Sequence, residues 1–388
     1  MPMDNETVIR KFVSPEIVYG VGASSLVGQY INTYGAERVM VVSDPGVMAA
    51  GWAESAIAGV SGVGAEAVLF SEVSANPRDH EVMQGVELYR AHRCDAIVVV
   101  GGGSPIDCAK GIGIVVSNNR HILEYEGVDH VGRPMPPLIC IPTTAGSSAD
   151  VSQFAIINDT SRLLKIAIIS KSTVPDVTLI DPSTTVTMDP YLTACTGMDA
   201  LVHAVEAYVS NAASPLTDLH ALQAIRLISA NLLTAIGEPD NLVARNGMML
   251  ASLEAGLAFS NASLGAVHAM AHCLGGMYDF PHGECNALLL EHVIRFNYQA
   301  APERYRDIAA ALTKTTTPSS SSGECEMLVA AIRDLRIAAG ITRTFGLAGV
   351  TSETIPDLAD KAMHDACMVT NPRRPTRRDI EEIYEHAL

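Results

Sequence analysis

The sequence predicts an α/β domain over residues 1–185, followed by an all-α domain over residues 186–388. The 388 residues correspond to roughly two or three domains, and a 48% share of hydrophobic residues is enough to form a core in each. Short β-branched runs alternate with helix-like stretches before Asp181, whereas apolar residues recur every three or four positions after Pro190. The stretch between these two residues marks the predicted boundary.

The strands of the first domain are predicted from continuous apolar runs. Strands that are buried on both faces, as in a parallel sheet covered by helices, have this pattern. The runs are Arg38 to Val42, Ala96 to Val100, Leu138 to Ile141, Ile166 to Ile169 and Val177 to Ile180. Between two of them, apolar residues at helical spacing predict a helix over His80 to His92.

The second domain is predicted to be helical throughout. Ala255 to Tyr278 lacks Asp, Glu, Lys and Arg and is long enough to raise the question of a membrane span. Because it contains two histidines and four glycines, we favour a buried helical segment. The low-complexity run Thr315 to Ser322 is predicted to be a loop between helices.

Charge and cysteine usage narrow the class of protein. The 26 Lys and Arg against 43 Asp and Glu give a net charge of −17, whereas nucleic-acid binding depends on clustered basic residues. The first twelve residues lack the apolar core of a signal peptide, so we expect no leader. The eight cysteines contain no C-x-x-C pair. We therefore expect reduced thiols, a cytoplasmic protein, and neither a nucleic-acid nor a membrane partner.

A glycine-rich turn follows the predicted strand Ala96 to Val100. Gly101 to Gly103 permit a sharp turn and a close approach to a ligand, and Ser104 is predicted to be the N-cap of a helix with Pro105 in its first position and Asp107 closing a capping box. The free N–H groups of such a helix start bind phosphate. The motif is not G-x-G-x-x-G, and an ordinary strand-to-helix turn is the alternative.

Two further segments follow predicted strands. A carboxylate at a strand end, as at Asp44, accepts hydrogen bonds from a ribose diol and repels a 2′-phosphate, which favours NAD over NADP. The cluster Pro142 to Ser148 offers hydroxyl groups at the edge where open α/β sheets bind ligands. A turn residue and an ordinary polar loop are the respective alternatives.

Potential metal ligands recur at helical spacing in the second half. Asp199 and His203 stand at i and i+4, His268 and His272 repeat this spacing, and His282 follows on a predicted turn. Buried side chains of these types need partners, and one divalent cation satisfies several. The five candidates predict a mononuclear Fe(II), Zn or similar site with one imidazole left free for proton transfer. A hydrogen-bonded core residue is the alternative for any one of them.

Longer motifs around these residues resemble the iron-containing, or group III, alcohol dehydrogenase family. They are GGGSPIDCAK, IPTTAG, KIAI, GMDALVHAVEAYVS, GAVHAMAHCLGGMYDFPHGECNA and TNPRRPT, in this order along nearly the whole chain. Within the family, the sequence is most similar to methanol, 1,3-propanediol and lactaldehyde dehydrogenases. The resemblance implies a dinucleotide-binding domain and a helical domain, as in dehydroquinate synthase, with a cleft between them.

The resemblance also implies roles for particular residues. The implied metal ligands are Asp199, His203, His268 and His282, which leaves His272 near the nicotinamide. The positions that correspond to NAD contacts are Asp44, Asn76, Gly102, Gly103, Ser104, Asp107, Thr143, Thr144, Ser147 and Lys165. The positions that correspond to the substrate pocket are Phe154, Phe259 and Cys367.

The chain departs from the family pattern at two places. Ser147 to Asp150 stands where Thr-Gly-Ser-Glu is usual, so the contacts of this loop are open to change. Cys273 replaces a usual proline, and a thiol beside His272 is expected to make the enzyme sensitive to oxidation.

The implied reaction is the reversible oxidation of a short primary alcohol or diol to its aldehyde. The metal, Fe(II) first and Zn or another divalent ion second, acts as a Lewis acid, NAD takes the hydride, and His272 carries the proton. An NAD-using, metal-dependent lyase of the dehydroquinate synthase type is the alternative, and a non-catalytic scaffold is a third reading. The apolar helical half and the resemblance together predict a homo-oligomer, a dimer or higher.

Overall fold

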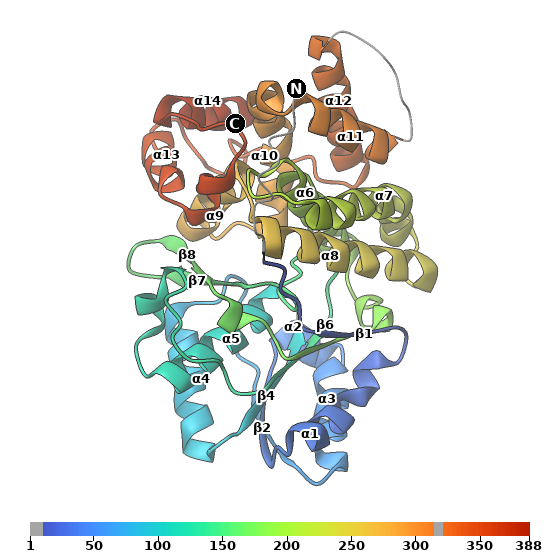
Figure 1. Cartoon of the computed structure of the whole chain (residues 1–388), viewed down its shortest axis with the longest axis vertical. Helices are drawn as coiled ribbons and strands as arrows, with labels where there is room; N and C mark the ends of the chain where they lie inside the picture. The colour runs from blue at the N-terminus through green and yellow to red at the C-terminus, as the bar shows by residue number, and fades with distance from the viewer. Residues whose placement is uncertain (1–10, 314–320) are drawn as a thin grey trace.

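The computed structural model describes residues 11–313 and 321–388, with backbone only for residues 321–322. In the first part of the chain, strands alternate with helices, whereas the described residues of the second part form helices without strands (Figure 1). The change falls between Ile180 and Pro190. The first ten residues, on which the expectation of no leader depends, lie outside the described part. So does most of the predicted loop Thr315 to Ser322, whose last two residues already belong to helix α12 (Ser321–Ala338).

A six-stranded, all-parallel sheet forms the centre of the first part, and it contains four of the five predicted strands. In spatial order it consists of β1 (Glu16–Tyr19), β9 (Val177–Ile180), β6 (Leu138–Pro142), β4 (Ala96–Gly101), β2 (Arg38–Val42) and β3 (Glu66–Phe70). The sequence analysis missed the partly exposed edge strands β1 and β3, although each contains a short apolar run after its first glutamate.

Helices cover both faces of this sheet (Figure 1). Alternate residues of β2 face opposite sides, so that Met40 packs under α4 (Asp79–His92) and α5 (Gly103–Asn118). On the other side, Val41 packs under α1 (Val27–Tyr34) and α3 (Trp52–Gly62). A short helix, α2 (Pro45–Ala49), follows β2.

The predicted strand Ile166 to Ile169 does not belong to the parallel sheet. It is part of β8 (Leu164–Ile169), which pairs antiparallel with β7 (Phe154–Asp159) and parallel with β5 (Gly127–Val128) in a separate sheet. In this small sheet, β7 packs against α5 and β8 packs against α9. The prediction of a strand is therefore confirmed, but its expected place in the parallel sheet is wrong. An apolar run indicates that a strand is buried on both faces, but it does not indicate which strand it pairs with.

The helical part contains the remaining long elements. They are α6 (Pro190–Val209), α7 (Pro215–Gly237), α8 (Leu242–Ala262), α9 (Ala266–Tyr278), α10 (His282–Asn297), α11 (Pro302–Thr313), α12, α13 (Ile355–Met363) and α14 (Arg377–Ala387). The uncharged stretch Ala255 to Tyr278 is divided between α8 and α9, because Ser263 has a left-handed φ of 61° and breaks the helix. Among the described helices, α7 alone has the length and apolar composition of a membrane span, a criterion that core helices also meet.

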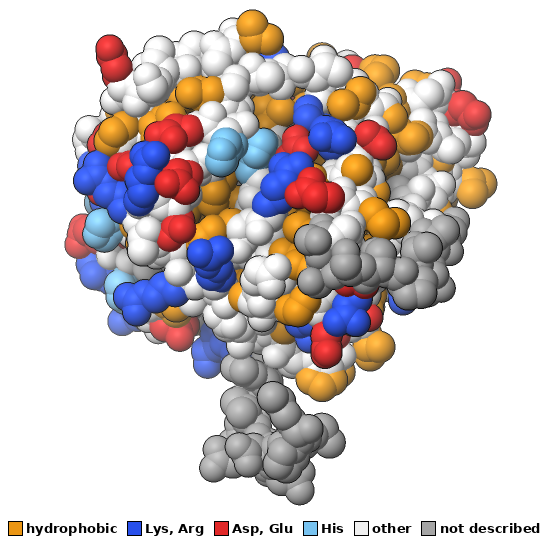
Figure 2. Space-filling model, turned by 90° about the horizontal axis from the view of Figure 1, so that it is seen from above, with side chains coloured by type: hydrophobic (Ala, Val, Ile, Leu, Met, Phe, Trp, Pro, Cys, Tyr) orange, Lys and Arg blue, Asp and Glu red, His pale blue; other side chains and the backbone are white. Residues whose placement is uncertain are grey.

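The basic residues near the C-terminus are matched by acidic neighbours. Arg378 pairs with Glu385 at 3.0 Å, and Arg377 pairs with Asp360 at 3.1 Å. Figure 2 shows basic and acidic side chains side by side on the helical end of the molecule. These arginines therefore do not form the clustered positive surface that a nucleic acid requires.

Candidate active site at the domain junction

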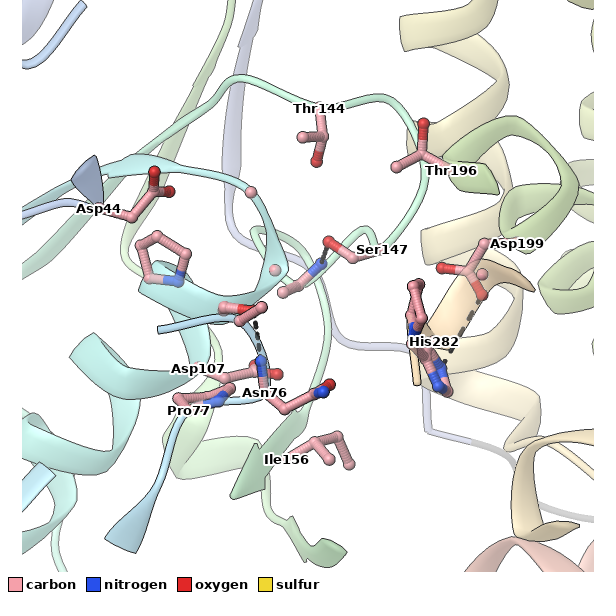
Figure 3. A pocket seen from close by; sticks show the side chains of 18 of the residues that line it. Asp44, Asn76, Pro77, Asp107, Thr144, Ser147, Ile156, Thr196, Asp199 and His282 are labelled. Atoms are coloured by element: carbon pink, nitrogen blue, oxygen red, sulfur yellow. Dashed lines mark hydrogen bonds and ion pairs between the residues drawn. The ribbon is translucent and has the colours of Figure 1, made fainter. Parts of the chain in front are cut away.

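A cleft of about 820 Å³ lies between the carboxyl ends of the parallel strands and the helices α6, α8, α9 and α10. It is lined by every residue that the sequence singled out as a ligand or contact, except Cys367. Figure 3 shows Asp44, Asn76 and Asp107 on the α/β side and Asp199 and His282 on the helical side of this one cavity. The predicted cofactor contacts and the predicted metal ligands therefore line the same cavity.

The glycine turn begins α5, but its N-cap is Gly102 and not Ser104 as predicted. No side chain caps this helix. The Ser104 hydroxyl instead accepts a hydrogen bond from the Asn76 N–H at 3.3 Å, and Asp107 lies beyond the capping position. Because a glycine cap has no side chain to satisfy the first N–H groups, they stay available to an anion.

Gly102 and Gly103 are required by close packing against the loop after β6. A Cβ on Gly102 would lie 3.0 Å from Thr144, and a Cβ on Gly103 would lie 2.8 Å from Ser147. The ends of β4 and β6 are paired at Gly101 and Pro142, which brings the two loops together. The glycine turn and the hydroxyl cluster thus form one wall of the cleft.

Asp44 caps α2 and also faces the glycine turn. Its Oδ1 accepts from the Val47 N–H at 3.0 Å. This oxygen therefore has the local structural role that the alternative interpretation, a turn residue, expects. The other oxygen, Oδ2, would lie 3.5 Å from a Cβ placed on Gly101. Asp44 therefore places negative charge beside the glycine turn.

Asn76 links the two parts of the molecule across the cleft. Its side-chain NH2 donates to Asp279 at the end of α9 over 2.7 Å, and its Oδ1 accepts from Lys165 Nζ over 2.5 Å. Arg78 adds an ion pair to Asp279 at 3.3 Å. Asn76 and Asp279 both have left-handed backbones, with φ of 57° and 56°. Such conformations cluster at ligand clamps.

Burial perturbs the ionisable groups on the α/β side of the cleft. It raises the pKa of Asp107 to about 7, against the opposing effect of Lys110. Burial also lowers the pKa of Lys165. In both side chains, burial disfavours the charged form.

The four predicted metal ligands gather around one point. The Nε2 atoms of His203, His268 and His282 lie 4.0, 3.8 and 3.9 Å from Asp199 Oδ1. The donor atoms of Asp199, His268 and His282 all lie within 4.8 Å of one another. Asp199, His268 and His282 are therefore close enough to share one divalent metal, and His203 adds a fourth side chain within 4.0 Å of Asp199 although it does not belong to this mutual group.

Helix α6 holds two of these ligands in register. Asp189 caps the helix by accepting from the Leu192 N–H at 2.9 Å, and Pro190 occupies the first position. Asp199 and His203 then fall on one face, and Glu206 follows on the same side. Burial lowers the pKa of His268 and His282 well below the ordinary value, so both imidazoles are neutral and ready to bind a cation.

Hydrogen bonds fix the orientation of the imidazoles. His268 Nδ1 contacts Glu206 at 2.6 Å, and His203 Nδ1 contacts the Gly146 carbonyl at 3.2 Å, which directs each Nε2 toward Asp199. Burial raises the pKa of Glu206 to about 7, although the Val267 N–H also donates to its carboxylate. The sequence analysis missed Glu206, and its spacing from His203 on α6 was the available signal.

Asn286 is a second residue that the sequence analysis missed. It lies one turn after His282 on α10, and its Nδ2 is 2.6 Å from Asp199 Oδ1 and 3.1 Å from His268 Nε2. Its own Oδ1 and the His282 Nδ1 have no hydrogen-bond partner. Unpaired buried polar atoms are costly, and their presence beside four converging donors is expected where a cation organises the site.

His272 stands apart from the four ligands. Its Nδ1 is 2.8 Å from Asp365 Oδ2, and its ring stacks on His282 with centroids 5.4 Å apart. Asp365 lies 93 positions further along the chain, and no sequence signal singled it out. Cys367 is fully buried next to Asp365 and does not line the cleft, so its predicted place in the substrate pocket is not supported.

An aromatic wall adjoins the metal site. Phe259 stacks on the His203 ring at 4.3 Å, and Phe154 meets Phe259 edge-on at 5.6 Å. Both side chains line the cleft. They give the space beside the ligands an apolar surface, which suits a short carbon chain.

The structure accommodates both departures from the family pattern. Ser148 has a left-handed φ of 51°, which a glycine adopts more readily, and its hydroxyl donates to the Ser252 carbonyl at 2.6 Å. Cys273 is fully buried and its Sγ contacts the Ala269 carbonyl at 3.4 Å. Burial raises the pKa of this thiol, so the expected sensitivity to oxidation is not supported. All eight cysteines are buried, and none is paired, in agreement with the expected reduced thiols.

Comparison with known proteins gives matches over both parts of the chain. A model described as "Iron-containing alcohol dehydrogenase" matches residues 14–182, and one described as "Fe-containing alcohol dehydrogenase family, C-terminal" matches residues 193–388. The 1,3-propanediol dehydrogenase of Citrobacter freundii is 41% identical and covers 95% of this chain and 96% of its own length. The NAD-dependent methanol dehydrogenase of Bacillus methanolicus is 37% identical over 97% and 99%.

A solved structure titled as 1,3-propanediol oxidoreductase has the same fold. It superposes with a TM-score of 0.94 at 40% identity and covers 98% of this chain and 100% of its own. The predicted fold class, a parallel α/β part followed by a helical part, is thereby confirmed.

Proposed function

Since the chain belongs to the iron-containing alcohol dehydrogenase family, we propose that it transfers a hydride reversibly between a short-chain primary alcohol or diol and NAD. One observation carries the proposal. Four metal-binding side chains converge in the same cleft as an uncapped, glycine-rich helix start. A lyase of the dehydroquinate synthase type is not favoured, because the relatives are named as dehydrogenases.

Each part of the cleft has a task in this reaction. The N–H groups at Gly102 and Gly103 would hold the pyrophosphate, and Asp44 would accept the ribose hydroxyl groups. Asp199 and the three histidines around it would hold a divalent cation, which would polarise the substrate hydroxyl as a Lewis acid. The aromatic wall would hold the carbon chain close to the nicotinamide.

His272 is the proposed proton carrier. It lines the cleft, and its Nε2 is free because Nδ1 is engaged by Asp365. In the oxidation direction, this atom takes the hydroxyl proton while the substrate carbon gives its hydride to NAD.

The decisive experiment combines elemental analysis with an NADH absorbance assay over short alcohols and diols. His268→Ala is expected to lose bound metal and activity together while still binding NAD, whereas His272→Ala is expected to keep the metal and lose rate. Failure of every alcohol to yield NADH with the metal-loaded protein would contradict the proposal and favour the lyase. Full rates for His272→Ala across the pH range would remove His272 from the mechanism.

Three finer points belong to the same proposal. Fe(II) is the expected metal, with Zn as the main competitor, since the set of one carboxylate and three imidazoles admits both. A cytoplasmic location agrees with eight unpaired, buried thiols. A homo-oligomer, a dimer or higher, agrees with exposed leucines on α7 such as Leu216 and Leu219, and light scattering of the purified protein tests it.

A further inference from the structure

We propose that Asp365 is a positioning residue that holds His272 in the tautomer and orientation needed for proton transfer. The inference rests on the proposed function, because it assigns a partner to the proposed proton carrier. Asp365 does not line the cleft, so it would act only through His272.

The carboxylate of Asp365 is fixed at both oxygens. Oδ2 is 2.8 Å from His272 Nδ1, and Oδ1 accepts from the Cys367 N–H at 2.8 Å, where Asp365 caps the short 3-10 helix Ala366–Thr370. The side chains of His272 and Asp365 are 3% and 6% exposed. An anchored carboxylate in so dry a place leaves the imidazole little freedom to turn.

This contact determines which nitrogen of His272 carries the proton. A carboxylate only accepts hydrogen bonds, so Nδ1 must be the donor, and in the neutral ring Nε2 is then the acceptor. The ring plane is held as well, because His282 stacks on it at 5.4 Å and His268 meets its edge at 6.1 Å. The acceptor nitrogen is therefore set before a substrate arrives.

The same neighbourhood does not form a second cation site. His272, Asp365 and Cys367 offer donor atoms within 4.8 Å of one another. However, the 2.8 Å between His272 Nδ1 and Asp365 Oδ2 is a hydrogen-bond distance, shorter than the roughly 3.3 Å between neighbouring ligands in a tetrahedral zinc site. The geometry thus favours a hydrogen-bonded pair.

The proton step is balanced with this pair in place. The alcohol loses a hydride to NAD and its hydroxyl proton to His272 Nε2, which gives the aldehyde, NADH and an imidazolium that later releases its proton to water. The negative charge of Asp365 offsets the positive charge on the ring while the proton is held there. Without it, the ring would gain charge in a buried site after losing the one carboxylate that contacts it directly.

The test is a pair of substitutions that differ in the atoms they offer. Asp365→Asn is nearly isosteric, but it replaces one accepting oxygen with a donating NH2. The Cys367 N–H competes for the oxygen that is left, so the NH2 turns to Nδ1 and the wrong tautomer results. We expect kcat to fall by about 10²-fold or more, with metal content and the alcohol KM within about twofold. Asp365→Glu keeps both acceptors and should retain more of the rate than Asp365→Asn.

A double-mutant cycle separates positioning from a general structural role. Asp365→Asn in the His272→Ala background should cause no further loss beyond about twofold, because the residue through which it acts is gone. Single-turnover NADH formation gives the rate where steady-state turnover is too slow. Asp360→Asn on α13, which removes an exposed ion pair with Arg377, serves as the matched control and should leave kcat unchanged.

Three results would overturn the inference while leaving the proposed function intact. One is a wild-type rate for Asp365→Asn, and another is an equal loss in the presence and absence of His272. The third is an Asp365→Glu variant that is slower than Asp365→Asn. If the unsubstituted, metal-loaded protein oxidises no alcohol, both the proposed function and this inference fail.

Discussion

Gly283→Ala should disrupt the metal site without touching a ligand. A Cβ at this position, directly after His282, would lie 2.3 Å from the Cys195 carbonyl oxygen on α6. An ordinary contact begins at 3.4 Å, so the first turn of α10 must move about 1 Å away from α6, which carries Asp199. Metal–ligand distances tolerate only about 0.2 Å, and a misplacement of about 1 Å costs on the order of 10²-fold in rate.

We expect Gly283→Ala to bind less than a stoichiometric amount of metal and to lose about 10²-fold in kcat. The added methyl group should also lower the free energy of unfolding by about 1–3 kcal/mol, as overpacking does. Elemental analysis after gel filtration and urea denaturation of the metal-free protein measure the two effects separately.

The matched control is Gly237→Ala, at the end of α7. A Cβ there meets nothing within 4 Å, so the substitution should leave the metal content unchanged and stabilise the chain by up to about 1 kcal/mol. Stoichiometric metal and full activity in Gly283→Ala would refute the view that contact between the α6 and α10 backbones sets the ligand geometry.

Three further predictions follow from other parts of the cleft. Asp44→Gly should raise the ratio of kcat/KM for NADP to that for NAD about tenfold or more, at a capping cost of only a few tenths of a kcal/mol, and an unchanged ratio in steady-state kinetics would exclude Asp44 as the determinant. Asp279→Gly keeps the left-handed backbone but removes the contacts to Asn76 and Arg78, so the Kd of NADH, measured by fluorescence, should rise about three- to tenfold; an unchanged Kd would contradict a link across the cleft. Burial lowers the pKa of His282, so below pH 6.5 the unfolded chain takes up a proton that the folded, metal-free chain refuses, and stability falls as the pH drops. His282→Gln should reduce this loss by up to about 1.4 kcal/mol per pH unit in urea titrations, and an identical pH dependence would contradict the assignment.

Local signals predicted most of the fold because burial and local chemistry coincide there. The run Ala96 to Val100 is buried on both faces in the centre of the sheet, and the glycines after it are required by contacts with Thr144 and Ser147. An apolar run can also be buried outside the parallel sheet, and it then predicts the wrong sheet. The run Ile166 to Ile169 is enclosed by helices and pairs in a different sheet.

In the site, too, local spacing predicted some residues, whereas others come together only through the tertiary fold. The i, i+4 spacing predicted that Asp199 and His203 share a helix face, since both positions lie within one regular element. Asp365 had no such signal, because only the folding of α9 against the C-terminal segment brings it to His272. Ser104 was misassigned as a cap because the propensity for hydroxyl caps does not register that this helix start is left open toward the cleft.

The Gly146 peptide group is one of the contacts that join the loop after β6 to the predicted metal ligands. The Gly146 carbonyl accepts from His203 Nδ1 at 3.2 Å, and Gly146 lies between Thr144 and Ser147 in the loop that closes on the glycine turn. A Cβ at this position would lie 2.5 Å from the Thr196 carbonyl oxygen, so the loop cannot shift without disturbing α6. If the loop holds a dinucleotide and His203 a cation, as proposed above, this contact would make each ligand favour the binding of the other.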